Sequence, residues 1–357
     1  MAQKMTSYFN DFLKEIRLTE NQVSELKQAH KTLRNRLLSD DDVSKYIETT
    51  FLQGSYKRST AVRPKNGNRS DVDIVVVTKF DKDECTPDEV LDVFEPLLKK
   101  YYDGKYRKQG RSWGIEMDLD LVPTSSVSLA EFGLLQNKML ESEDDIISLY
   151  ETKQYNIKGY NWNCEFDSFF SKSNDWKDEP LFIPDREAEK WDKTHPLEQI
   201  RWTQEKNKNC NGHYVNVVKC IKWWRKEKYP DVKHPKSYPL EHFIGDCCPD
   251  DITSVAEGIT LTLEKMVSDY SAKPYLADRG VPEHDVFARL TEEDYSEFYD
   301  AVCDAAQIAR SAYDASSVQE SADLWRQLFG NKFPEPPKKD AIFTERKSNT
   351  SSIPGGR

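Results

Sequence analysis

The chain has 357 residues, of which 37% are hydrophobic and 32% charged, and this composition favours a folded protein with a charged surface over a disordered chain. Acidic residues outnumber basic ones by 62 to 51, a formal charge of -11, which argues against an unspecific binder of DNA or RNA backbones. There is no apolar run of bilayer-spanning length and the first residues are too polar for a secretion signal, so we expect a cytoplasmic protein without membrane attachment.

The N-terminal half mixes helical and strand patterns. Apolar residues recur at three-, four- or seven-residue intervals over residues 5–38, which predicts helix. The β-branched run at 71–78 and the alternating run at 114–122 each predict a strand. Between them, a Thr-Pro-Asp start and an apolar stripe predict a helix over 86–102.

The C-terminal half is predicted to be helical. Residues 123–195 show few clear periods, whereas apolar residues recur at helical spacing from His195 onward. The end of the chain is rich in Pro, Lys and Ser, which predicts a flexible tail. We therefore expect an α+β protein with a core and N-terminal helices over 1–160, a loop-rich connection over 161–195, a helical domain over 196–332 and a tail over 333–357.

Two carboxylates lie two positions apart on the first predicted strand. A strand has a period of two, so Asp71 and Asp73 point to the same face. Such a pair is also typical of the exposed face of a half-buried sheet. A divalent cation such as Mg²⁺ would offset the repulsion between the two carboxylates, because it prefers a few carboxylates together with phosphate oxygens.

A third carboxylate strengthens the metal interpretation. Asp120 lies on the second predicted strand, where an inward-facing carboxylate without a partner would be costly. Its neighbour in the alternation, Asp118, would share that face and competes for the same role, although we prefer Asp120 as the third ligand.

A glycine and a serine precede these aspartates. Gly54 and Ser55 stand at a turn that is predicted to open a helix, where glycine lets a phosphate approach the backbone. In the chemistry that this set supports, one Mg²⁺ held by Asp71, Asp73 and Asp120 lowers the pKa of an attacking hydroxyl. A second ion neutralises the leaving pyrophosphate. Mn²⁺ would substitute for Mg²⁺.

These residues resemble the fingerprint of the DNA polymerase β-like nucleotidyltransferases, in particular the bacterial relatives of cyclic GMP-AMP synthase called cGAS/DncV-like nucleotidyltransferases. The fingerprint is a Gly-Ser pair, an Asp-x-Asp strand and a later lone aspartate, and here it reads Gln53-Gly54-Ser55, Asp71-Val72-Asp73 and Asp120-Leu121-Val122-Pro123. The resemblance implies a polymerase β-like core joined to a helical domain, with the active site in the cleft between them.

A second match lies far downstream, in the predicted helical half. The segments around Ile221-Lys222-Trp223-Trp224 and Ser237-Tyr238-Pro239-Leu240-Glu241 are similar to two motifs of the family. By this resemblance Lys222 and Ser237 contact the donor triphosphate, and Tyr238 stacks on a base. Without it, the aromatic residues are typical of a helical core and Lys222 of a solvated face.

The family implies a cyclic di- or trinucleotide product, made from ATP and GTP or another nucleoside triphosphate and used as a second messenger in CBASS antiphage defence. It also implies HORMA-like or ubiquitin-transfer-like partner proteins, to which the Gly355-Gly356 end would be suited. Two alternatives remain: a linear or RNA-tailing nucleotidyltransferase, and a non-catalytic sensor or antitoxin subunit. The acidic charge disfavours the first, and the retention of three mutually repelling aspartates disfavours the second.

Overall fold

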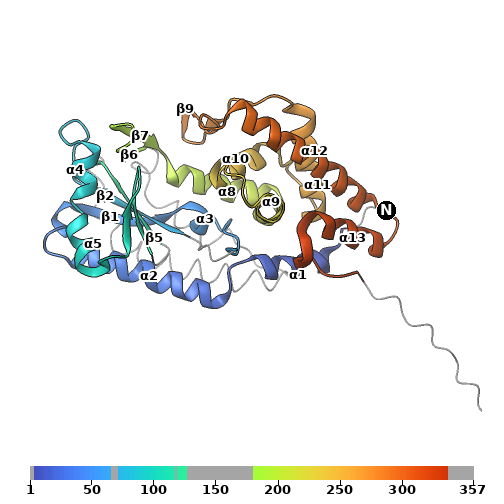
Figure 1. Cartoon of the computed structure of the whole chain (residues 1–357), viewed down its shortest axis with the longest axis horizontal. Coiled ribbons are helices and arrows are strands. Elements are labelled where there is room, and N and C mark those ends of the chain that lie inside the picture. Colours follow the sequence, from blue (N-terminus) through green and yellow to red (C-terminus); the bar gives the residue numbers. More distant parts are fainter. Residues whose placement is uncertain (1–3, 66–70, 117–118, 127–179, 337–357) are drawn as a thin grey trace, which may run out of the picture.

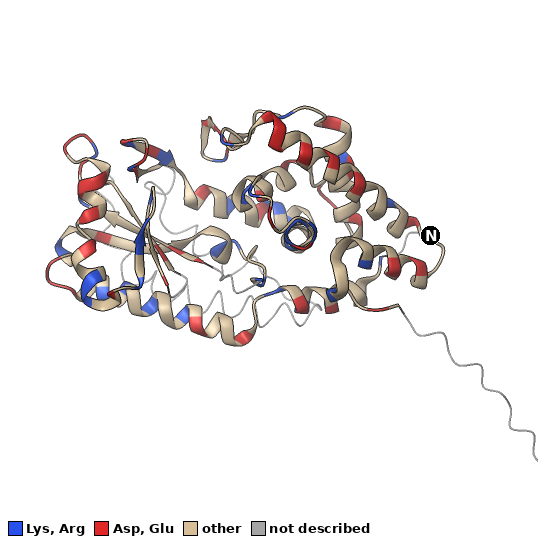
Figure 2. Cartoon of the chain, in the orientation of Figure 1, with Lys and Arg blue, Asp and Glu red and all other residues tan. Residues whose placement is uncertain are grey.

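The computed structural model describes residues 4–65, 71–116, 119–126 and 180–336. Within these residues the chain forms a half built around a β-sheet and a half built from helices (Figure 1). Both signs of charge are interspersed along the outer helices of the two halves (Figure 2). No helix among the described residues is both long and apolar enough to cross a membrane.

The sheet of the first half has five strands in the order β1-β2-β5-β4-β3. Strands β2 and β5 are parallel, while the other neighbouring pairs are antiparallel, so the sheet is mixed as expected. The strands are β1 (Ile47–Gln53), β2 (Val72–Thr78), β3 (Tyr106–Lys108), β4 (Trp113–Ile115) and β5 (Leu119–Thr124).

Three helices accompany this sheet, and their apolar sides join one buried cluster with it. They are α2 (Glu20–Ser39), α4 (Pro87–Asp92) and α5 (Glu95–Tyr102). The cluster includes Leu33 of α2, Leu98 of α5 and Ile74 of β2, none of which retains measurable exposure. A short α3 (Gly54–Lys57) and a 3-10 turn, η1 (Ser44–Tyr46), flank β1.

Two of the predicted helices are each divided in two. Residues 5–38 form α1 (Thr6–Ile16) and α2, because Thr19 starts a new helix with a capping box to Gln22. Residues 86–102 form α4 and α5, and Pro96 stands in the first turn of α5, where its missing N–H costs nothing.

The prediction of one strand over 114–122 was wrong. Residues 113–115 and 119–124 belong to two antiparallel strands, β4 and β5, and Gly114 pairs with Asp120. The alternation of apolar and polar residues could not reveal the break, because each strand of an antiparallel pair alternates with the same period of two. Position 118 lies outside the described residues, so its competition with Asp120 remains open.

The predicted connection contains regular structure at its end. Leu181–Asp185 (β6) and Lys190–Thr194 (β7) form an antiparallel hairpin, whereas residues 127–179 lie outside the described residues. The predicted boundaries at 160 and 195 therefore stay predictions.

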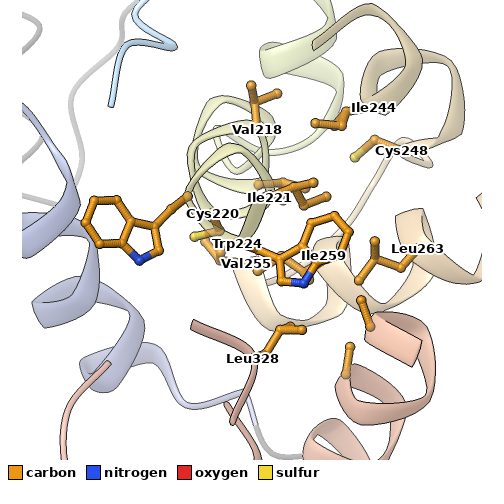
Figure 3. Close-up of a cluster of buried hydrophobic side chains, with 14 of the residues drawn as sticks. Val218, Cys220, Ile221, Trp224, Ile244, Cys248, Val255, Ile259, Leu263 and Leu328 are labelled. Atoms are coloured by element: carbon orange, nitrogen blue, oxygen red, sulfur yellow. The ribbon is translucent and has the colours of Figure 1, made fainter. Parts of the chain in front are cut away.

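The second half is helical, as expected, with one small hairpin that the sequence did not reveal. Its helices are α8 (Pro196–Asn209), α9 (Tyr214–Lys228), α10 (Ser237–Cys247), α11 (Val255–Asp269), α12 (Glu292–Asp314) and α13 (Val318–Phe329), followed by a 3-10 turn, η4 (Gly330–Lys332). The hairpin is β8 (Ala277–Asp278) with β9 (Val281–Asp285). Helix α9 contacts α1, α8, α10, α11 and α13, and Figure 3 shows part of the core around it.

The first helix of the chain packs with the last ones. In Figure 1, α1 lies beside α13, and the rings of Phe9 and Phe12 meet those of Trp325, Phe329 and Phe333. The centroids of Phe12 and Phe329 are 4.7 Å apart. Burial of this aromatic group stabilises the contact between the chain's start and the helical half.

Candidate active site

Asp73 lies at the centre of the predicted carboxylate set. It stands on β2, between β1 and β5, and the strand register places it opposite Gln53 on one side and Asp120 on the other. The parallel pairing of β2 with β5 thus brings together two aspartates that are 47 positions apart in the chain (120 - 73). Asp71 immediately precedes β2.

The carboxylate of Asp73 lies directly against Gly54. A Cβ atom placed on Gly54 would be 1.8 Å from Oδ2 of Asp73, and the backbone of Gly54 has φ +75°. Only glycine meets both conditions, since other residues rarely adopt this φ and their side chains would displace the carboxylate. Gly54 is therefore needed for the placement of Asp73, a reason that the sequence had not indicated.

The pKa values of all three carboxylates are raised, and those of Asp73 and Asp120 are raised partly by their carboxylate neighbours. Burial, followed by the charge of Asp73 and then Asp71, raises the pKa of Asp120 to about 7. Burial raises the pKa of Asp73 to about 6, against the opposing effect of Arg58. Loss of hydration also raises the pKa of Asp71. Such a group of carboxylates attracts a divalent cation, which would hold them in their charged form.

The carboxylates are placed as neighbours by strand register and do not form a closed ligand cage. Among the residues that the structure describes, no three His, Cys, Asp or Glu side chains converge as a metal site. Gln109 donates from Nε2 to Oδ1 of Asp120 at 3.2 Å, so this carboxylate has a fixed neighbour. The donor set fits Mg²⁺, which keeps several water or phosphate ligands and uses only one or two carboxylates for each ion.

A cleft of about 980 Å³ lies between the two halves and contains most of the predicted site residues. The lining includes Gln53, Gly54, Ser55, Asp71, Asp73, Lys222, Ser237 and Tyr238. Asp120 is not part of the lining and lies beside Asp73 in the sheet. The structure thus gathers predicted residues from β1, α3, β2, α9 and α10 at one cavity large enough for nucleotide ligands.

Lys222 is engaged in a buried ionic network. Its Nζ lies 2.6 Å from Oε1 of Glu241 and 3.0 Å from the carbonyl oxygen of Thr60. The other carboxylate oxygen of Glu241 accepts from Thr60 Oγ1 at 2.8 Å and from Arg58 Nε at 3.2 Å. Because Arg58 and Thr60 belong to the first half and Lys222 and Glu241 to the second, this network joins the halves at the cleft floor.

Two further cationic side chains, which the sequence analysis had not singled out, also line the cleft. Lys226 follows Lys222 by one helical turn, and among the described residues it has no ion-pair partner within 4.0 Å. Burial and the charge of Lys222 lower its pKa to about 8, while Asp71 raises it. Arg58 lies with its guanidinium 5.2 Å from the ring centroid of Tyr238. Helical spacing from Lys222 was the signal that would have pointed to Lys226.

The comparisons with known proteins agree with this geometry. Residues 3–132 match the profile described as Second Messenger Oligonucleotide or Dinucleotide Synthetase domain. Over 349 residues the chain is 45% identical to a cyclic AMP-AMP-GMP synthase of Enterobacter hormaechei, covering 92% of this chain and 91% of that protein. The chain belongs to the cGAS/DncV-like nucleotidyltransferases.

More distant members share the fold of this cGAS/DncV-like nucleotidyltransferase. A cyclic AMP-AMP-AMP synthase of an Acinetobacter species is 30% identical over 339 residues, which cover 91% of this chain and 84% of that protein. The structure of DncV from Vibrio cholerae with a linear intermediate is 16% identical, with a TM-score of 0.65 and 94% and 97% of the two chains covered. CdnC of E. coli in complex with HORMA has a TM-score of 0.63 at 16% identity, with 92% and 98% covered.

These findings confirm the predicted fold and the predicted class of enzyme. The protein is a nucleotidyltransferase that makes cyclic oligonucleotides, and its core is the polymerase β-like sheet with an attached helical domain. The roles of the individual site residues remain predictions.

Proposed function

We propose that this nucleotidyltransferase joins ATP and GTP into a cyclic AMP-AMP-GMP trinucleotide. The strongest support is the 45% identity to a cyclic AMP-AMP-GMP synthase across almost the whole chain. A second protein, a probable cyclic AMP-AMP-GMP nucleotide synthase of Salmonella paratyphi B, is 44% identical over 353 residues. In each step a ribose hydroxyl bonds to an α-phosphorus, and one pyrophosphate leaves.

In this proposal the aspartates hold two Mg²⁺ ions, and Mn²⁺ can replace them. Bound there, the ions would lower the pKa of the attacking hydroxyl and offset the charge of the leaving pyrophosphate. Asp71, Asp73 and Asp120 would be the protein ligands. Ser55, Lys222 and Ser237 would bind the triphosphate together with Lys226, and Tyr238 would orient a base. Lys222 positions Arg58 and Glu241 at the floor of the cleft.

The proposed reaction is tested by incubating the protein with each nucleoside triphosphate, singly and in combination, in the presence of MgCl₂. We expect a phosphatase-resistant product with the mass of cyclic AMP-AMP-GMP only when ATP and GTP are both present. Asp73→Asn should abolish it, whereas Asp103→Asn, in an exposed position after α5 and away from the cleft, should leave it unchanged. Linear products alone, or none with any combination, would overturn the proposal.

We also propose a cytoplasmic antiphage role with a HORMA-like partner. The similarity in fold to CdnC, which is known in a complex with HORMA, supports this choice of partner. Co-purification of the chain with a co-expressed HORMA-like protein, and an increase in product when the two are mixed, would test the proposal. Independent migration in size-exclusion chromatography together with unchanged product would contradict it.

A further inference from the structure

Asp278 is a cleft residue whose position the sequence analysis did not indicate. It ends β8, in the small hairpin of the helical half, and lines the same cleft as the aspartates of the sheet. Tyr238 donates its hydroxyl to Oδ1 of Asp278 at 2.6 Å, and Gln199 Nε2 lies 3.5 Å from the same oxygen. Both partners use one carboxylate oxygen.

The second oxygen of Asp278 has no hydrogen-bond partner among the described residues. Burial raises the pKa of this carboxyl, against the opposing effects of Tyr238, Gln199 and Arg279. The neighbouring Arg279 does not form an ion pair with it, because that guanidinium binds Asp246 at 2.8 Å and lies over the ring of Trp202. Asp278 thus offers a partly buried acceptor that still has capacity for a donor.

The ring of Tyr238 offers a surface on which a base can stack, and the carboxylate hydrogen-bonded to its hydroxyl, Asp278, lies where the polar edge of that base would be. The guanidinium of Arg58 lies over this ring at 5.2 Å, and the ring of His242 packs edge to face against it at 6.1 Å. In the proposed complex an aromatic base stacks there, on the part of the Tyr238 ring that lines the cleft. A base stacked there would bring its polar edge toward the tyrosine hydroxyl and therefore toward Asp278. An ionised carboxylate only accepts hydrogen bonds, so it pairs with a base edge that donates.

The purine bases differ at this edge. Guanine presents the N1–H and 2-amino donors side by side, whereas adenine presents an N1 acceptor beside its 6-amino group. We propose that Asp278 selects guanine over adenine at the subsite formed by Tyr238. This inference rests on the proposed function, in which GTP is one of the substrates.

The test compares two variants of the full-length protein. Together they separate two roles of Asp278: selecting the base and holding Tyr238 in position. In Asp278→Asn, the amide oxygen still accepts from Tyr238, but the amide nitrogen presents a donor toward the base. Tyr238→Phe removes the hydroxyl and keeps both the ring and the carboxylate. Binding of non-hydrolysable GTP and ATP analogues is measured by calorimetry with MgCl₂, and unfolding midpoints confirm that each variant is folded.

We expect Asp278→Asn to lower the preference for the GTP analogue over the ATP analogue by roughly ten- to hundredfold, because a site built to accept hydrogen bonds discriminates strongly. Tyr238→Phe should weaken both analogues by similar factors. ITP lacks the 2-amino group, so it should compete less well than GTP in the wild type and about equally in Asp278→Asn.

An unchanged preference in Asp278→Asn would overturn the inference and leave Asp278 as a residue that only positions Tyr238. Equal binding of the two analogues by the wild type would also overturn it. Failure of the proposed function would give a different result. The wild type would then make no cyclic trinucleotide, while its preference for the GTP analogue and the effect of Asp278→Asn on that preference could still be as expected.

Discussion

Glu241→Gln should be strongly destabilising, because Glu241 is the only carboxylate in the network that joins the halves at the described part of the cleft floor. The side chains of Glu241 and Lys222 are each 5% exposed, and that of Arg58 is 7% exposed. The change keeps the shape of the side chain and removes its charge. Lys222 would then lose its carboxylate partner, and Arg58 would be left with its electrostatic interaction with Asp73. The new amide group would also present N–H donors to at least one of these two cations.

The expected cost follows from burial. Breaking a buried ion pair by neutralising one partner typically costs about 3–5 kcal/mol, whereas an exposed pair contributes about 0–1 kcal/mol. Glu241 faces Lys222 at 2.6 Å and Arg58 at 3.2 Å, so we expect Glu241→Gln to lower the free energy of unfolding by about 3–5 kcal/mol.

The assay is urea unfolding followed by tryptophan fluorescence, with Glu264→Gln as the matched control. Glu264 pairs with Arg310 at 2.6 Å, but these side chains are 36% and 37% exposed, and the pair lies within the helical half. We expect a loss of at most about 1 kcal/mol for this control. If the two variants were destabilised equally, the assignment of the network as the ionic connection between the halves would be wrong.

Three further predictions concern the cleft. Gly54→Ala should reduce product formation by at least about a hundredfold, because the new Cβ would displace the Asp73 carboxylate. Gly104→Ala is the control: Gly104 has a similar φ of +70° but open space around it, so this variant should lose only about 1 kcal/mol of stability. Lys226→Ala should weaken binding of a non-hydrolysable ATP analogue by about tenfold in calorimetry. Like Lys226, Lys228 is exposed, but it does not line the cleft, so Lys228→Ala should change this binding less than about twofold; equal effects would remove Lys226 from the site. The raised pKa of Asp73, about 6 against 3.8, means that the metal-free native state loses stability from this group as pH rises from about 4 to about 6. Asp73→Asn should therefore stabilise the metal-free protein by about 1–3 kcal/mol at pH 8 and by little at pH 4 in urea unfolding, and an equal gain at both values would contradict the assignment.

Local patterns predicted the elements that depend on local chemistry. The β-branched run before Thr78 predicted β2, and its period of two placed Asp71 and Asp73 on one face. The start at Thr86 was also recognisable, because its capping box with Glu89 is complete within four residues. The apolar spacing after His195 predicted the helical half, although β8 and β9 are too short to give a periodic signal.

The sequence by itself therefore predicted the class of the protein, which the comparisons confirm, and singled out Asp71, Asp73 and Asp120 as its central carboxylates, whose roles stay predictions. Only the tertiary structure decided that residues 113–115 and 119–124 form two separate strands, that Asp73 and Asp120 are register partners, and that Lys222 pairs with Glu241. The same holds for the meeting of Asp278 with Tyr238. The physical reason is that these contacts join residues far apart in the chain, and their formation depends on packing between elements that no local period encodes.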